Sequence, residues 1–391
     1  MITTESRVHY SLGFNYDPDL IRGIAKANQK YGALSRIEEV FGAMADSPVS
    51  SARPTSRIPN LKWEEFASQI RSLRDFGVAF NFLMNTSQRL DSALTNELKT
   101  YLQRLMDAGV ERITAGTPEL CAFVKSVFPQ FHVTISITYG IHSRRKLAKA
   151  ELAGADAVYL DGVYVNRDFD LLRTLLRRAR VECRLYANLS CLSRCPVVGK
   201  HYRMFSGHQT ELTAVRNDAF FAGCSIVKLN NPTEWLQMPW IRPEDIPAYA
   251  SEGVSHFKLA DRLAPTSTLL GIARSYLKRR SPNNLFHLME RNGSKYGLIS
   301  KIFANTHQDQ RVPLYIHNKK LPSNFIEHFR QDGCKSNDVN CTVCTEFTQK
   351  AAEINGRWRN EFASTVNDLV PIQLLKRLQS VHQNNAKPNP V

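Results

Sequence analysis

Several common targeting signatures are missing from this chain of 391 residues. The N-terminal stretch MITTESRVHYSLGF has no basic start followed by an apolar run, so we expect no secretory signal peptide. No stretch approaches the roughly 18 consecutive apolar residues of a membrane-spanning helix. These absences predict a soluble, cytoplasmic protein without membrane insertion. In a reducing cytoplasm, its eight cysteines suit metal binding or thiol chemistry better than disulfide formation.

Catalytic and cofactor motifs are missing as well. The chain has neither a G-x-S-x-G nucleophile elbow nor an H-E-x-x-H zinc helix, which weakens the case for a peptidase. No glycine-rich fingerprint follows the first strand-like run, which argues against a dinucleotide site. A formal net charge of +15 favours anionic partners, which include a carboxylate, a phosphorylated metabolite and RNA. Nothing resembles an aromatic-rich RNA-binding motif, so RNA remains one alternative among these.

Short apolar runs alternate with helical patterns from residue 7 to about residue 280. The strand-like runs are RVHYSLGFNY, SRIEEVFG, GVAFNFLMN, ERITAG, FHVTISITYG, ADAVYLD, VECRLYANLS and VSHFKLAD. Strands separated by helices predict a parallel sheet, and eight of them can close a barrel. We therefore predict the α/β class and a (β/α)8 TIM-like barrel over residues 1–280, with an open doubly wound sheet as the alternative. A cysteine-bearing insertion at 190–250 precedes strand eight, and residues 281–391 form a small C-terminal extension.

Polar residues gather at the predicted strand ends, where a barrel of this kind carries its chemistry. They are Asn15, Glu39, Asn85, Ser136, Asp161, Asn188, Lys258 and Arg262. From this set we take Glu39, Asp161, Asn188, Lys258 and Arg262 as catalytic candidates, the two carboxylates as proton carriers. Each is alternatively a cap, a loop residue or a salt-bridge partner.

Three more residues are candidates for substrate binding. Arg53 and Arg57 lie in the long loop after strand two, and an arginine fork binds a carboxylate in bidentate fashion. Together with the strand-eight cations they predict a site for an anionic small-molecule substrate or donor. His201, in the insertion, is a candidate base or ligand, or else a residue that caps its loop.

The stretch NLSCLSRCP places Cys191 and Cys195 just past strand seven, and Cys224 lies in the insertion. Three thiols near the predicted barrel mouth suit a soft metal or an iron–sulfur cluster. Zinc with a histidine as fourth ligand is the rival, and ordinary buried cysteines are the third possibility. A second group, Cys334, Cys341 and Cys344, has C-x2-C spacing and predicts a possible second metal site without an evident fourth ligand. Cys121 and Cys183 are expected in the core.

Several stretches resemble the collagenase-like peptidase family, which is numbered thirty-two among peptidases of unknown mechanism. They include FNYDPDLI, VAFNFLMN, ISITYGIHS, NLSCLSRCPVVGKHY and PWIRPEDIPAYASEGVSHFKLADR, and the resemblance covers most of residues 8–345. It implies a TIM-like barrel, in agreement with the strand count. Family members were first described as proteases, so a peptidase is one expected function.

Better-understood relatives in that family imply a different activity. They resemble enzymes that hydroxylate without oxygen, in RNA modification and ubiquinone synthesis, with prephenate as a proposed oxygen donor. Such relatives hold a 4Fe–4S cluster on four cysteines. Cys191, Cys195 and Cys224 match three of those positions, whereas the stretch RNDAFFAGC lacks the extra cysteine that relatives often carry there. The resemblance thus predicts an iron–sulfur oxidoreductase, with a peptidase or a non-catalytic cluster-bearing subunit of a complex as alternatives. A homo- or hetero-oligomer is compatible with each.

Overall fold

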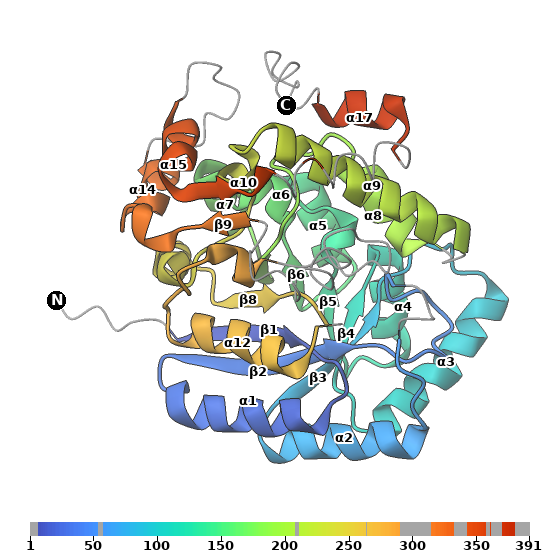
Figure 1. Ribbon diagram of the computed structural model, residues 1–391. Helices are drawn as coiled ribbons and strands as arrows, with labels where there is room; N and C mark the ends of the chain where they lie inside the picture. The colour runs from blue at the N-terminus through green and yellow to red at the C-terminus, as the bar shows by residue number, and fades with distance from the viewer. Residues whose placement is uncertain are drawn as a thin grey trace.

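Eight parallel strands form a closed barrel in the computed structural model (Figure 1), which confirms the predicted fold. The structure describes residues 7–53, 58–207, 211–262, 264–289, 314–331, 342–356, 360 and 370–379, without the side chains of residues 205 and 211–218. The strands are β1 (Val8–Gly13), β2 (Ser35–Gly42), β3 (Ala79–Met84), β4 (Arg112–Ala115), β5 (His132–Ile135), β6 (Ala157–Tyr159), β7 (Glu182–Tyr186) and β8 (His256–Leu259). Each strand pairs in parallel with the next, and β8 pairs with β1, so that Lys258 lies beside Ser11.

Helices between the strands cover the outside of the barrel. They are α1 (Pro18–Tyr31), α2 (Trp63–Asp75), α3 (Ser92–Asp107), α4 (Pro118–Val127), α5 (Arg144–Leu152), α6 (Gly162–Val165), α7 (Phe169–Leu176) and α12 (Thr266–Leu277). The first shows why these segments are helical: Asp17 caps α1 by accepting from the Asp19 N–H, and Pro18 occupies the first turn, where its missing N–H costs nothing. Its buried face includes Leu20 and Ile24, each worth about 1.5–3 kcal/mol.

The insertion before β8 forms helices beside the barrel. These are α8 (Val198–Ser206), α9 (Glu211–Asn230), α10 (Glu234–Gln237) and α11 (Ile246–Ser251). Figure 1 shows α8 next to α9, and the terminal helix α17 (Ile372–Gln379) over α9. Leu378 of α17 is fully buried, and a Cβ atom on Gly223 of α9 would lie 2.6 Å from its Cδ1 atom. Gly223 therefore allows these two helices to approach closely.

The C-terminal extension packs on the barrel through apolar contacts. It contains β9 (Leu314–Ile316), α14 (Phe325–Gln331), α15 (Val343–Ala351) and β10 (Ala352–Ile354), and β9 pairs antiparallel with β10. Phe325 stacks on Trp240 with ring centroids 5.9 Å apart. The Arg167 guanidinium lies 5.0 Å from the Trp240 ring centroid and 5.1 Å from that of Phe325, which joins the extension to the barrel. None of the described helices is both long and apolar enough to span a membrane.

Candidate active site

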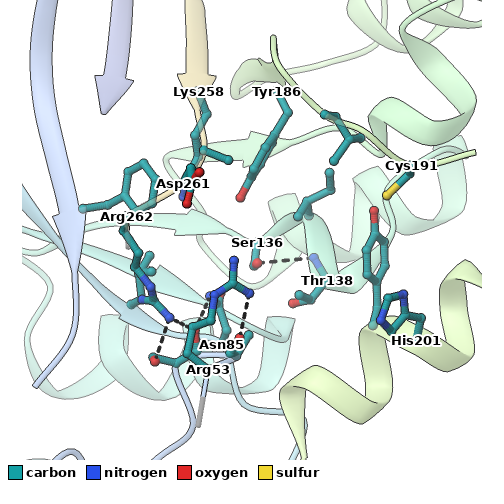
Figure 2. Close-up of a pocket in the computed structure, with 18 of the residues that line it drawn as sticks. Arg53, Asn85, Ser136, Thr138, Tyr186, Cys191, His201, Lys258, Asp261 and Arg262 are labelled. Carbon is teal, nitrogen blue, oxygen red and sulfur yellow. Dashed lines mark hydrogen bonds between the residues drawn. The ribbon is translucent and has the colours of Figure 1, made fainter. Parts of the chain in front are cut away.

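A cavity of about 110 Å³ lies at the C-terminal ends of the strands (Figure 2). Its wall combines cations, aromatic rings and small polar groups from the strand ends, the loops and the insertion. The sequence-predicted residues among the lining are Arg53, Asn85, Ser136, Cys191, His201, Lys258 and Arg262. Strand ends, the loop at 51–53 and the insertion are far apart in sequence, and the closed barrel brings them to one mouth.

Arg262 is the most constrained cation of this cavity. It follows β8, where a Cβ atom on Gly13 would lie 2.6 Å from its backbone nitrogen, so a glycine at the end of β1 allows the loop to pass. The residue as a whole is 7% exposed, and Nη2 donates to the carbonyl and hydroxyl oxygens of Ser51 at 3.0 and 3.1 Å. Nη1 is buried without a hydrogen-bond partner. Burial, aided by the like charge of Arg53, lowers the pKa of Arg262 to about 9, so it remains charged at neutral pH.

Lys258 lies among three aromatic rings at the end of β8. Its Nζ atom is 3.7 Å from the ring centroid of Phe41, 4.9 Å from that of Tyr159 and 5.3 Å from that of Tyr186. These cation–π contacts stabilise the ammonium group in a position that is 3% exposed. The rings hold the charge at the cavity wall, where an anion can pair with it.

The loop after β2 brings Arg53 to the same cavity. Ser51 anchors this loop, because its carbonyl oxygen accepts from Asn85 at 3.2 Å as well as from Arg262. Ala52 has a φ of 61°, and Arg53 Nη1 donates to the Ala52 carbonyl at 3.1 Å. Two arginines and a lysine thus face one small cavity. Arg57, the other arginine predicted to bind substrate, lies outside the described residues.

His201 of α8 contributes a neutral imidazole to the wall. Its ring stacks on Phe220, with centroids 4.8 Å apart and an interplanar angle of 13°. Burial and the positive charge of Arg53 lower the pKa of His201 to about 3, so the ring is uncharged at neutral pH. Cys191 lines the same cavity (Figure 2). An acid role for His201 is therefore disfavoured, while a role as hydrogen-bond partner or ligand remains compatible with its state.

Glu39 was predicted at the rim, but it lies inside the barrel. Strand β2 continues to Gly42, and Glu39 accepts from the Ser11 hydroxyl at 2.6 Å and pairs with Arg112 at 2.9 Å and Arg184 at 3.4 Å. Burial alone would raise its pKa, but Arg184 and the other nearby positive groups hold the pKa of Glu39 well below the usual range. It is a fully paired interior carboxylate and does not line the cavity.

Asn188 and Asp161 lie at strand ends, as predicted, but their contacts are structural. Asn188 is fully buried; it donates to the Ala260 carbonyl at 3.0 Å and accepts from the Ala260 N–H at 2.8 Å, which fixes the end of β8. Asp161 caps α6 by accepting from the Val163 N–H at 3.3 Å, and it also accepts from the Tyr202 hydroxyl at 3.4 Å. Neither residue lines the cavity, so both support the mouth from behind.

The insertion cysteines gather beside the cavity. Cys195 is 5% exposed, and its thiol forms a hydrogen bond with that of Cys224, while Cys191 is close enough to influence the same thiol. All three are free of disulfides. The contact with Cys224 and burial raise the pKa of Cys195, whereas Cys195 and the ammonium of Lys228 lower that of Cys224. Of these two thiols, that of Cys224 therefore ionises more readily.

These thiols fit the donor type of an iron–sulfur cluster, which is held by cysteine thiolates. In the described part of the chain, however, no three His, Cys, Asp or Glu side chains are arranged as ligands of a single metal ion. The shared cluster therefore stays a prediction. So does the second metal site, because Cys334 and Cys341 lie outside the described residues. Its third member, Cys344, is buried in α15 within the apolar core.

Several lining residues were missed by the sequence reasoning. Tyr186 and Phe41 face the cavity from β7 and β2, and Ser51 and Asp261 do so from loops. The first two could have been found from the sequence, because side chains two residues apart in a strand point to the same face. Tyr186 is two residues before Asn188, and Phe41 is two residues after Glu39. Asp261 has a φ of 106°, a left-handed conformation that is strained for a non-glycine residue. No pattern in the sequence marks that strain.

Known proteins resemble this chain to different degrees. No protein-family model matches it. The uncharacterized protease MJ1657 of Methanocaldococcus jannaschii is 23% identical over 310 residues, which cover 78% of this chain and 86% of the relative. Among solved structures, the U32 peptidase Mk0906 covers 67% of this chain and 95% of its own, with 16% identity and a TM-score of 0.43. A GH113 β-1,4-mannanase covers 70% of this chain and 99% of its own, with 12% identity and a TM-score of 0.36. This chain is thus similar over most of its length to a protein named as a protease, in keeping with the resemblance to the collagenase-like peptidases that its sequence motifs carry.

Proposed function

We propose that this protein is an enzyme that binds a small carboxylate-bearing molecule at the barrel mouth, next to an iron–sulfur cluster held by Cys191, Cys195 and Cys224. The reaction class we favour is oxygen-independent hydroxylation or a related redox modification. The molecule in the cavity is then either the oxygen donor or the substrate, and RNA is a further substrate class. The proposal extends the family relationship with the site's own chemistry.

The observation that carries the proposal is the state of Arg262. Arg262 is 7% exposed, and its buried Nη1 atom has no hydrogen-bond acceptor, which is unfavourable for a buried charged donor. Arg53 and Lys258 line the same cavity and add positive charge. A carboxylate would meet the free nitrogen and offset the charge at once, since arginine binds carboxylates through a planar fork. The rings of Phe41 and Tyr186 supply an apolar wall for the rest of the ligand.

The size of the cavity favours a metabolite over a polypeptide. A buried water needs about 10–15 Å³ of such volume, so the cavity of about 110 Å³ holds roughly 7–11 waters or a ligand with a similar number of heavy atoms. This is smaller than the roughly 300–1,000 Å³ of many drug-sized ligand sites. A compact mono- or dicarboxylic acid fits these limits.

The residues at the barrel mouth would have different roles in the proposed reaction. A cluster, when bound, would supply one-electron chemistry beside the cavity, just past the end of strand β7. Arg262 and Arg53 would orient the anion, and Lys258 would hold its charge against the aromatic wall. The neutral His201 can accept or donate a hydrogen bond without adding charge. Asn188 keeps the end of β8 in place through its two bonds to Ala260.

A peptidase is the second candidate, because two relatives are named as proteases or peptidases. Cys191 and His201 both line the cavity, and a thiol with a nearby imidazole is the minimum for nucleophilic hydrolysis. A Ser–His–Glu series also exists: Ser11 Oγ lies 2.6 Å from His256 Nε2, and His256 Nδ1 lies 3.7 Å from Glu182 Oε1. Ser11 and His256 are at most 1% exposed inside the barrel, however, where no peptide bond can reach them.

Anaerobic purification separates these candidates. We expect iron and acid-labile sulfide in the protein, a visible absorption band, and saturable binding of benzoate that Arg262→Met abolishes. A colourless protein that lacks iron and hydrolyses gelatin, with activity lost in Cys191→Ser, would support the peptidase. A coloured protein that does not bind benzoate would instead support a non-catalytic cluster-bearing subunit.

A further inference from the structure

A second hollow lies at the opposite end of the barrel, where the strands begin. It has a volume of about 580 Å³, several times that of the cavity at the mouth. Its walls come from the starts of β1, β2, β3 and β4 and from the turn that follows α2. Four arginines line it, Arg7, Arg36, Arg74 and Arg112, against the two carboxylates of Glu38 and Glu111. The proposed function uses none of these residues.

Two of the four arginines are already paired. Arg112 lies between Glu38 and Glu39, with nitrogen–oxygen distances of 2.5 and 2.9 Å. Glu38 also pairs with Nδ1 of His9 at 2.9 Å, and these contacts hold the pKa of Glu38 well below the usual range. Arg74 pairs loosely with Glu111 at 3.5 Å across an exposed surface. Both carboxylates of the hollow are therefore engaged.

Arg7 and Arg36 are different, because no carboxylate of the described residues pairs with either. Arg7 is exposed and donates from Nη2 to the Gly32 carbonyl at 3.2 Å. Arg36 is half-buried and donates from Nη2 to the carbonyls of Gly77 at 2.7 Å and Phe76 at 3.3 Å. These bonds fix the guanidinium but leave its charge uncompensated. Its Nε atom is buried without a hydrogen-bond partner.

The turn that holds Arg36 is shaped for close approach. Gly77 has a φ of 65°, which glycine adopts without strain, and a Cβ atom there would lie 2.7 Å from Arg36 Nη2. A side chain at position 77 would displace the guanidinium. The turn thus presents a guanidinium whose orientation is set before any ligand arrives, which reduces the entropy cost of binding.

We propose that this hollow is a binding site for a small phosphate-bearing anion. Two uncompensated guanidiniums match a dianionic phosphate, because arginine forks donate paired hydrogen bonds to phosphate oxygens. The volume falls within the roughly 300–1,000 Å³ of ligand sites, enough for a diphosphate or a nucleotide-sized molecule. Chemistry in TIM barrels takes place at the opposite end, so this is a binding site rather than a second active site.

Calorimetric titration of the full chain with inorganic pyrophosphate at low ionic strength tests the site. We expect saturable binding that weakens about tenfold or more in both Arg36→Gln and Arg7→Gln, because each loses a charge-assisted contact. Arg7 is exposed, so its variant carries little risk of misfolding. Arg274→Gln, on the exposed face of α12, removes the same charge elsewhere and should bind as the wild type does.

Arg262→Gln separates this site from the barrel mouth. We expect pyrophosphate to bind it with wild-type affinity. The proposal is overturned if no saturable binding occurs, if Arg7→Gln and Arg274→Gln bind equally well, or if Arg262→Gln abolishes binding while the Arg36 variant does not. The carboxylate site at the mouth is tested separately, by the binding of benzoate.

Discussion

Replacing Arg262 by methionine should stabilise the fold and abolish carboxylate binding. The pKa of this guanidinium, lowered from its ordinary value to about 9, corresponds to roughly 5 kcal/mol by which the folded protein disfavours the charge. Methionine removes that cost but leaves Ser51 without two of its hydrogen bonds, which costs about 1–3 kcal/mol. Asn85 still donates to the Ser51 carbonyl. We therefore expect a net stabilisation on the order of 2 kcal/mol, as when other buried charges are replaced by apolar groups.

Urea denaturation of the metal-free protein measures this effect, with benzoate titration as the functional readout. The control is Arg274→Met on the exposed face of α12, which should change the free energy of unfolding by less than about 0.5 kcal/mol. If Arg262→Met is destabilised by more than about 1 kcal/mol, the guanidinium stabilises the fold on balance. The interpretation that its Nη1 atom lacks a needed acceptor would then be wrong. Unchanged benzoate affinity in the variant would be equally damaging.

Three further outcomes are expected. Carboxylate affinity should fall as pH rises through about 9, because the anion binds the charged form of Arg262 and raises its pKa; titration across that range checks this, and a flat profile would contradict it. Leu378→Asp should make Cys224 react with iodoacetamide faster than Ile372→Asp does, since Leu378 is buried against Gly223 of α9 while Ile372 is 71% exposed; equal alkylation rates would show that α17 does not shield Cys224. Asn188→Ala should lower the free energy of unfolding by about 1–3 kcal/mol, measured in urea, through its lost bonds to Ala260.

The barrel was predictable because its signals are local. Each strand is a short apolar run, and the start of a helix such as α1 is marked in the sequence by a capping residue, Asp17, and by Pro18 in the first turn. Eight repeats of that pattern leave few alternatives to a closed barrel. The same local reading placed Lys258 and Arg262 near the end of β8, where they line the cavity.

The features of the site that the sequence did not reveal are contacts between residues distant in sequence. Glu39 was expected at a strand end, but it lies within β2, where Arg184 from β7, 145 positions away in sequence, compensates its charge. Asn188 was a catalytic candidate, and the structure pairs it with Ala260, 72 positions further along the chain. The anchor of Arg262 is Ser51, separated by 211 positions. A single sequence reveals none of these pairings, since each depends on how the barrel closes.

The most direct test of the proposed function is the iron and acid-labile sulfide content of anaerobically purified Cys195→Ser, compared with Cys121→Ser. Both residues are buried and both thiols are free, but Cys121 lies in α4 within the barrel's apolar core, whereas Cys195 contacts Cys224 beside the cavity. We predict that Cys195→Ser loses iron, sulfide and colour while Cys121→Ser retains all three. Equal iron and sulfide in the two variants, or none in the wild type, would contradict a cluster on Cys191, Cys195 and Cys224.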